Sequence, residues 1–99
     1  VITMYQAGGA FEQEPGDSFV ACFMDGYEKA LGRQVRQVGS PAGCDSRLWK
    51  NIAGCPTMQF GPGRLEECHS VNEYVETDSY LEAILVYAQL ILEWCKAKE

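Results

Sequence analysis

The segment from Ser79 to about Lys96 constrains the fold most, because apolar side chains surround most of the helix that it predicts. Ser79 and Glu82 fit a capping box at its start. A helix that is apolar on several sides has to be covered on more than one of them. We therefore expect this helix to be covered by polypeptide outside these 99 residues or by another chain. The side chains expected to be buried in this way are Leu85, Ile91, Leu92 and Trp94.

The rest of the chain alternates between helical and extended patterns. Residues 15–34 predict a helix with Asp17 as N-cap and Gly32 after the last turn. QVRQVG (34–39) predicts a strand, CDSRLWKNIAG (44–54) a helix stopped by its final glycine, and PTMQF (56–60) a second strand. The resulting order of helix, strand, helix, strand, helix is typical of an α/β layer architecture.

The charge pattern argues against a nucleic-acid or membrane partner. Fourteen acidic and eight basic residues give a net charge of −6, and the basic residues are scattered along the chain. Binding to a nucleic acid requires a basic stripe or patch, which is absent from the sequence. The longest apolar run, AILVYAQLIL between Glu82 and Glu93, is much shorter than the ~20 residues that span a bilayer.

The five cysteines indicate a reducing compartment. Their number is odd, their spacing is irregular, and no two of them form a C-x-x-C pair. A secreted disulfide framework normally has an even number of cysteines. No charged region followed by an apolar one opens the chain, so a secretion signal has no support. We therefore expect reduced cysteines in a cytoplasmic protein.

The chain reads as one small piece of a larger protein. It opens on VITMY without an initiator Met, and its last long segment is apolar on nearly every side. Its 99 residues, 46% of them hydrophobic and 22% charged, show no sign of disorder but can bury only a marginal core.

The stretch FGPGRLEECHSVNEYV (60–75) contains His69, the only histidine of the sequence. On its own, such a residue is a surface group, a helix cap or a side chain hydrogen-bonded to nearby backbone. The adjacent Cys68 makes a poor partner, because a catalytic thiol and its base normally come from distant parts of a chain. This chain alone does not supply the residues of a complete zinc site.

Four short motifs carry a resemblance to a known family. They are CDSR at residues 44–47, GCPT at 54–57, FGPG at 60–63 and CHSVNEYV at 68–75. In this order they resemble the C-terminal end of the metal-dependent amidohydrolases that include acetylornithine deacetylase, succinyl-diaminopimelate desuccinylase, aminoacylase and glutamate carboxypeptidase. The resemblance covers residues 40–95 well and residues 13–39 loosely.

This resemblance implies a fold and a domain organisation. Residues 1–99 would be the C-terminal segment of a three-layer α/β zinc-hydrolase catalytic domain. Residues 1–15 would be the return strand and hinge from an inserted dimerisation domain, through which the whole protein forms a homodimer. The rest of the catalytic domain would be a further partner of the chain.

The resemblance also implies a metal site. His69 would ligate one of two zinc ions, with cobalt or another divalent metal as alternatives. The remaining ligands and the glutamate that serves as general base would lie outside this chain, so no catalytic residue is expected within it. Asn72 and Glu73 either surround this histidine and orient its second ring nitrogen or cap the loop.

The resemblance also implies that two glycine-containing turns bind the substrate. Gly43 and Cys44, at the start of a helix, resemble a substrate-contacting turn whose free N–H groups face a carboxylate or carbonyl oxygen. Gly61 and Gly63 either let backbone approach the substrate or serve ordinary turn geometry. Cys44 stands where the family has Ser or Thr, Cys68 where it usually has Ala, and Val71 where Pro is common. These departures leave the substrate subclass open.

The function expected from the resemblance is hydrolysis of an amide bond by a zinc-activated water, removing an acyl group from a small N-acyl amino acid or amine. A different amide substrate, as in a peptidase, a desuccinylase or a deformylase, is an alternative. A second alternative is a non-catalytic α/β interaction module that has lost its metal ligands.

Overall fold

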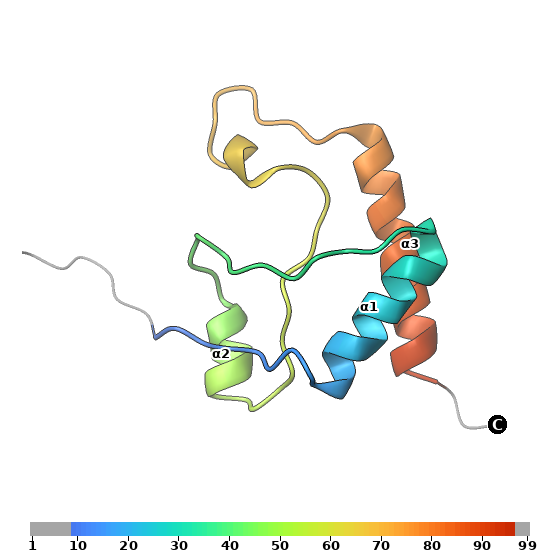
Figure 1. Cartoon of the computed structure of the whole chain (residues 1–99). Helices are drawn as coiled ribbons and strands as arrows, with labels where there is room; N and C mark the ends of the chain where they lie inside the picture. Colours follow the sequence, from blue (N-terminus) through green and yellow to red (C-terminus); the bar gives the residue numbers. More distant parts are fainter. Residues whose placement is uncertain (1–8, 97–99) are drawn as a thin grey trace, which may run out of the picture.

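The computed structural model describes residues 9–96 of the chain (Figure 1). Two long helices, α1 (Ser18–Leu31) and α3 (Thr77–Trp94), pack side by side. A short helix, α2 (Ser46–Asn51), lies apart from this pair, and a single 3-10 turn, η1 (Leu65–Glu67), lies in the long connection to α3. Among these elements, only α1 and α3 pack against each other.

The predicted caps of α1 are confirmed. The Asp17 side chain accepts a hydrogen bond from the backbone N–H of Phe19 at 2.8 Å, which satisfies one of the free donors at the start of the helix. Gly32 ends the helix in the left-handed region, with φ 69°, and its N–H donates to the Glu28 carbonyl. Glycine reaches this conformation without steric conflict, so the local sequence alone sets both ends of α1.

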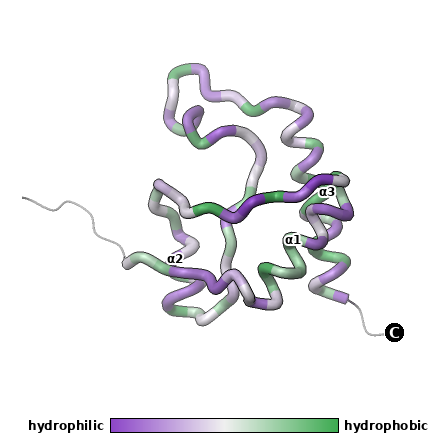
Figure 2. The backbone as a smooth tube through the Cα atoms, viewed as in Figure 1, coloured by the Kyte–Doolittle hydropathy of each residue, from purple (hydrophilic) through white to green (hydrophobic). Residues whose placement is uncertain are grey.

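The core lies between α1 and α3, along which hydrophobic and hydrophilic residues alternate (Figure 2). Four side chains form its buried centre: Val20, Phe23, Ala83 and Val86. Gly26 is buried as well, and a Cβ added there would lie 3.5 Å from Gln89 Cγ. The small residue lets the two helix backbones approach each other. At the edge of this contact Lys29 pairs with Glu93 at 2.8 Å.

The predicted capping box at the start of α3 is wrong. The helix begins at Thr77, two residues before Ser79, with Glu76 in the cap position. The Ser79 hydroxyl accepts a hydrogen bond from the backbone N–H of Gly63 at 3.0 Å. The Glu82 carboxylate pairs with the Arg33 guanidinium at 2.6 Å. Both side chains thus bond to distant parts of the chain and not to the helix end.

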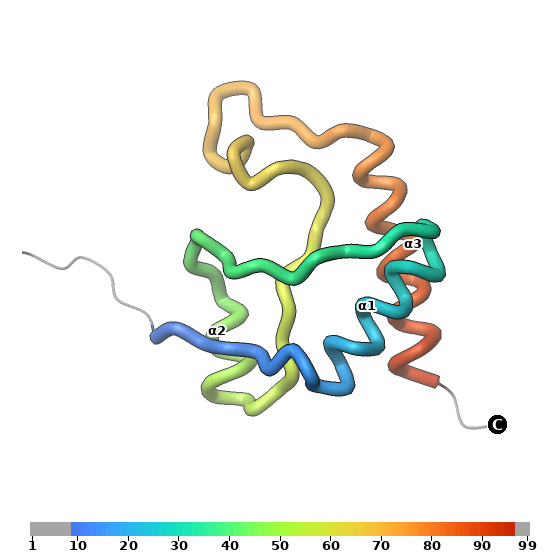
Figure 3. Tube along the Cα trace, in the orientation of Figure 1, coloured from blue at the N-terminus to red at the C-terminus, as the bar shows by residue number. Residues whose placement is uncertain are grey.

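The α/β prediction was wrong for the part of the chain that the structure describes. Residues 9–96 contain helices and no strand, so the three-layer α/β order of helix, strand, helix, strand, helix is not formed. The two segments predicted as strands, 34–39 and 56–60, are not joined by any backbone hydrogen bond and run in different directions (Figure 3). A strand exists only by pairing its N–H and C=O groups with a neighbouring strand. An extended sequence pattern without such a partner remains an irregular segment.

The return strand and hinge predicted for residues 1–15 stay a prediction. Residues 1–8 of the predicted return strand and hinge lie outside the described residues, and residues 9–14 form neither helix nor strand. The helix α2 ends at Asn51, before Gly54, which adopts φ 68° in the following turn.

No helix in residues 9–96 has the length and apolar character needed to cross a membrane.

Candidate functional site

Phe60 anchors the FGPG motif between the two long helices. Its ring contacts Phe23 and Tyr27 of α1, with centroid distances of 5.1 and 6.0 Å, and Tyr87 of α3 at 5.5 Å. Such edge-to-face aromatic contacts stabilise beyond the area that they bury. The Tyr87 hydroxyl also donates a hydrogen bond to the backbone carbonyl of Phe60. The motif therefore starts from a fixed point in the core.

Gly63 continues the turn in a conformation that requires glycine. Its φ is 88°, and a Cβ there would lie 3.3 Å from Val75 Cγ2. Its N–H donates to Ser79 in the first turn of α3. By contrast, a Cβ at Gly61 would meet no atom within 4 Å. The two predicted substrate-binding glycines thus differ: Gly63 is needed for the fold of the turn, and Gly61 faces open space.

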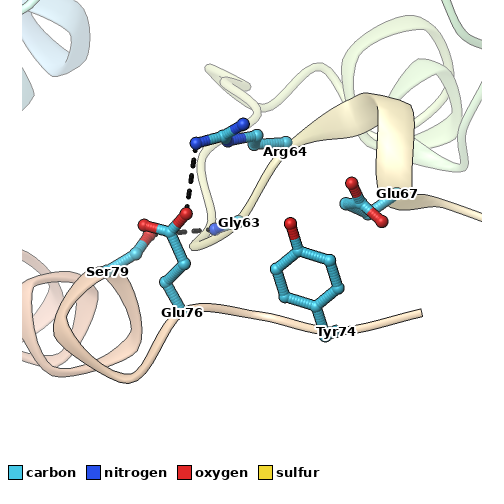
Figure 4. Close-up of a pocket in the computed structure, with 6 residues that line it drawn as sticks. All are labelled: Gly63, Arg64, Glu67, Tyr74, Glu76 and Ser79. Carbon is cyan, nitrogen blue, oxygen red and sulfur yellow. Dashed lines mark hydrogen bonds and ion pairs between the residues drawn. The ribbon is translucent and has the colours of Figure 1, made fainter. Parts of the chain in front are cut away.

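A small polar pocket of about 150 Å³ forms where this turn meets the start of α3 (Figure 4). Arg64 pairs with Glu76 across it at 3.1 Å, and the Tyr74 hydroxyl points into the space beside them. The pocket is lined by Gly63, Arg64, Glu67, Tyr74, Glu76 and Ser79. These contacts hold the turn against α3 and so position the loop that follows.

His69 lies on that loop, between η1 and α3, in the left-handed region with φ 60°. Asn72 has a similar φ of 59°. Outside glycine, Asn and His are among the residues that tolerate this conformation best. The backbone N–H of His69 donates to a Glu73 carboxylate oxygen at 3.3 Å, and the Ser70 hydroxyl donates to the Glu67 carbonyl at 2.7 Å. The loop is therefore shaped by hydrogen bonds of its own side chains.

The imidazole of His69 is exposed, and neither ring nitrogen has a hydrogen-bond partner among residues 9–96. In that same range, no group of three or more His, Cys, Asp or Glu side chains is close enough to hold a metal ion. A structural zinc site needs four ligands and a catalytic one usually three from the protein. Residues 9–96 therefore offer one available imidazole, and further ligands would have to come from other polypeptide.

The other predicted substrate-binding residues, Gly43 and Cys44, lie at the turn before α2. Both are exposed, and a Cβ at Gly43 would meet no atom within 4 Å. The Cys44 thiol accepts hydrogen bonds from the backbone N–H of Ser46, at 3.3 Å, and from the side chain of Gln59. The Asp45 carboxylate makes no cap hydrogen bond to α2.

The contact between Cys44 and Gln59 ties the turn before α2 to the residue that precedes Phe60. Sequence reasoning did not identify Gln59, because its spacing from Cys44 has no local pattern. The structure thus connects the turn at 43–44 to the start of the FGPG motif, and that motif to the His69 loop. No hydrogen bond joins His69 itself to Gly43 or Cys44.

The chain is similar in sequence to a family of peptidases and to several enzymes of known name. Residues 2–93 match the sequence profile of peptidase family M20/M25/M40. The N-formyl-4-amino-5-aminomethyl-2-methylpyrimidine deformylase of Halalkalibacterium halodurans is 41% identical over 51 residues, which are 52% of this chain and 12% of that protein. The deformylase of the same name from Bacillus subtilis is 29% identical over 90 residues, 91% of this chain and 21% of that protein. The acetylornithine deacetylase of Edwardsiella ictaluri is 38% identical over 42 residues, 42% of this chain and 11% of that protein.

No solved structure matches the chain. The chain spans between 11% and 21% of the length of these three relatives.

Proposed function

The chain belongs to peptidase family M20/M25/M40, and from this we propose that it is the part of a metal-dependent amide hydrolase that supplies the metal ligand His69. The match of residues 2–93 to the family carries the proposal. It confirms the resemblance drawn from the four sequence motifs. Members of this family are hydrolases and are generally metal-dependent.

The relatives favour removal of an acyl group as the reaction. Two of them are named deformylases and one a deacetylase. A fourth, from Bacillus subtilis, is named a putative dipeptidase and is 34% identical over 70 residues. We therefore propose an N-acyl amino acid or amine as the substrate. A formyl, acetyl, succinyl or peptidyl group remains as an alternative within the same reaction class.

The position of His69 fits one ligand of a divalent metal. An exposed imidazole without another hydrogen-bond partner in the described residues can present a ring nitrogen to an ion. Two zinc ions, or cobalt or another divalent metal in their place, would acidify a water and polarise the scissile carbonyl. The remaining ligands and the general base would come from polypeptide outside this chain.

This chain's own residues would position the ligand and the substrate. The bond from the His69 N–H to Glu73 holds the ligand's backbone, and Asn72 shapes the return of the loop. The Gly63 N–H already donates to Ser79, so a backbone donor to substrate from this turn would be Gly61. Gly43 and Cys44 would offer their N–H groups from the turn before α2.

The proposal extends to the surroundings of the chain. The rest of the catalytic domain would pack against it, a homodimer would form through a domain outside it, and the whole protein would work in the cytoplasm. The alternative of a non-catalytic interaction module predicts neither metal binding nor hydrolysis by the whole protein.

The test is His69→Ala in the full-length protein, with metal content and hydrolysis of N-formyl and N-acetyl substrates measured together. We expect activity to fall by orders of magnitude and bound metal to decrease, while the circular dichroism spectrum is unchanged. Val71→Ala is the matched control, because this side chain of the same loop is 92% exposed. Metal bound at wild-type affinity in the His69→Ala protein would show that His69 is not a ligand.

A further inference from the structure

A broad, open groove runs between the segment before α1, the connection from α1 to α2, and residues 57–60. Gln13 lies in its wall with only 8% of its surface exposed. The Gln13 side-chain oxygen accepts from the Thr57 N–H at 2.9 Å and from the Lys50 ammonium at 3.1 Å. Its side-chain nitrogen is buried and has no acceptor among residues 9–96. The oxygen of the Gln13 amide is thus fully hydrogen-bonded, whereas its NH₂ group has no acceptor in the described residues.

Arg47 lines the same groove and also has a buried donor without an acceptor in the described residues. It lies on α2 three residues before Lys50, and residues at this spacing are neighbours on one helix face. Because Lys50 contacts Gln13, that face of α2 is turned toward Gln13. The Nη1 atom of Arg47 is buried without an acceptor, and within the described chain Arg47 forms no ion pair.

These two unused donors define what would bind there. A buried N–H without an acceptor is unfavourable, and a buried N–H that belongs to a charged group is more so. Arg47 is a cation, and a charged donor bonds more strongly to an anionic oxygen than to a neutral one. A carboxylate has two oxygens and can accept from a guanidinium and from an amide at once. Two acidic residues of the groove lining, Glu12 and Asp45, do not pair with Arg47.

We propose that Gln13 and Arg47 are the donors of a carboxylate-binding site in this groove. The carboxylate belongs either to a small acid or to an acidic side chain of the protein outside residues 9–96. His69 does not line the groove, so the site does not depend on the proposed metal ligand. A protein that does not hydrolyse amides could still bind a carboxylate here. Failure of the proposed hydrolase function and failure of the proposed carboxylate site can therefore be told apart.

The first arm of the test is isothermal titration of the full-length, metal-free protein. N-acetylglycine supplies a carboxylate, and N-acetylglycinamide has the same shape without the charge. If a small acid occupies the site, we expect N-acetylglycine to bind, the amide not to bind, and Arg47→Gln to weaken binding by roughly tenfold or more. Arg36→Gln is the control, because it removes the same charge from an exposed position of the same groove.

Gln13→Glu tests the position of the acid. This substitution keeps the oxygen that accepts from Thr57 and Lys50 but places a carboxylate where the unused donor lies. We expect Gln13→Glu to abolish binding of N-acetylglycine without lowering the thermal unfolding midpoint. The carboxylate introduced at position 13 would accept the hydrogen bond of Arg47 and so take the place of the bound acid.

The second arm applies if an acidic side chain of the protein occupies the site. N-acetylglycine then does not bind, and Arg47→Gln unfolds at a lower temperature than Arg36→Gln at pH 7. That difference should disappear at acid pH, where the partner carboxylate is protonated, whereas a purely steric role of Arg47 would not depend on pH. The proposal is overturned if Arg47→Gln and Arg36→Gln behave alike in both arms.

Discussion

The Tyr87 hydroxyl donates a hydrogen bond to the backbone carbonyl of Phe60, and the two rings meet at a centroid distance of 5.5 Å with planes 67° apart. A single residue of α3 thereby holds both the side chain and the backbone of the residue that opens the FGPG turn. Because Gly63, a few residues later, bonds to Ser79 of the same helix, the turn is attached to α3 at two points. The position of the His69 loop depends on this attachment.

Replacing Tyr87 by Phe should loosen the turn without disturbing the core. The change removes the hydroxyl and keeps the ring, so we expect a loss of about 1 kcal/mol in the free energy of unfolding. Amide hydrogen exchange should become faster at Gly61 and Arg64. Tyr80→Phe is the matched control on the same helix, because Tyr80 is 53% exposed and makes no side-chain hydrogen bond within residues 9–96. Equal exchange rates in the two variants would contradict the role assigned to the hydroxyl.

Alanine substitutions should separate the two glycines of the turn. Gly63→Ala places a side chain at φ 88° and within 3.3 Å of Val75, so we expect a destabilisation of about 1–2 kcal/mol. Gly61→Ala meets no neighbour within 4 Å and should change stability by less than about 0.5 kcal/mol. Chemical denaturation of both variants measures the difference. A larger loss of stability in Gly61→Ala than in Gly63→Ala would contradict the requirement for glycine at position 63.

The contact at Gly26 should tolerate one methyl group and no more. A Cβ there lies at ordinary van der Waals distance from Gln89, and alanine favours a helix over glycine by about 1 kcal/mol. Gly26→Ala should therefore be neutral or stabilising. Gly26→Leu would push α1 away from α3, and overpacking of this kind typically costs about 1–3 kcal/mol. Thermal unfolding midpoints of the two variants decide the point, and a tolerated leucine would contradict the close approach.

Acid should lower the stability by weakening two ion pairs to α3, one from Lys29 of α1 and one from Arg33 just after α1. The hydrogen bond from Lys29 lowers the pKa of Glu93, and the hydrogen bond from Arg33 lowers the pKa of Glu82, both from the ordinary value of 4.5. A carboxylate whose folded pKa is lowered contributes stability that is fully present above its unfolded pKa. That contribution is lost as the pH falls below about 4.5 and through the folded pKa.

The measurement compares the unfolding midpoints of wild type, Lys29→Gln and Arg33→Gln between pH 7 and pH 2. The midpoint difference between wild type and each variant should narrow below pH 4.5 and at high salt, because both pairs are exposed. Arg36→Gln serves as the control without an ion pair in the described chain. A difference that does not change with pH would show that the pairs do not contribute through their charges.

The isolated chain should be unstable as a monomer because of α3. Leu92 is 69% exposed, and its neighbours Leu85 and Ile91 are more than half exposed. Uncovered apolar surface forfeits roughly 25 cal/mol for each Å² that burial would remove from water. We expect the isolated chain to self-associate or to unfold below ordinary temperatures, as sedimentation velocity and thermal melting would show.

Variants of α3 separate its exposed surface from its buried one. Replacing Leu85, Ile91 and Leu92 together by Gln should suppress self-association of the isolated chain and retain its helix content. Val86→Gln, at a fully buried position of the same helix, should abolish the helix pair. A wild-type monomer with cooperative unfolding at an ordinary midpoint would show that no further cover is needed.

The local signals of the sequence determined α1 and the candidate ligand. Asp17 and Gly32 act on the backbone within a few residues, so the sequence was sufficient to place both ends of this helix. His69 was found because it is the only imidazole and is framed by motifs that can be matched without a structure. The family membership followed from the same motifs, since each is a short run of consecutive residues.

Only the tertiary structure decided features that depend on distant partners. Ser79 and Glu82 have the spacing of a capping box, yet Gly63 and Arg33 compete for the same side chains and bind them. The roles of Gln13 and Gln59 had no local signal at all, because their partners lie 44 and 15 residues away. The strand predictions were wrong for the same physical reason. A sequence pattern can favour an extended backbone, but its hydrogen bonds require a neighbouring strand that the pattern does not encode.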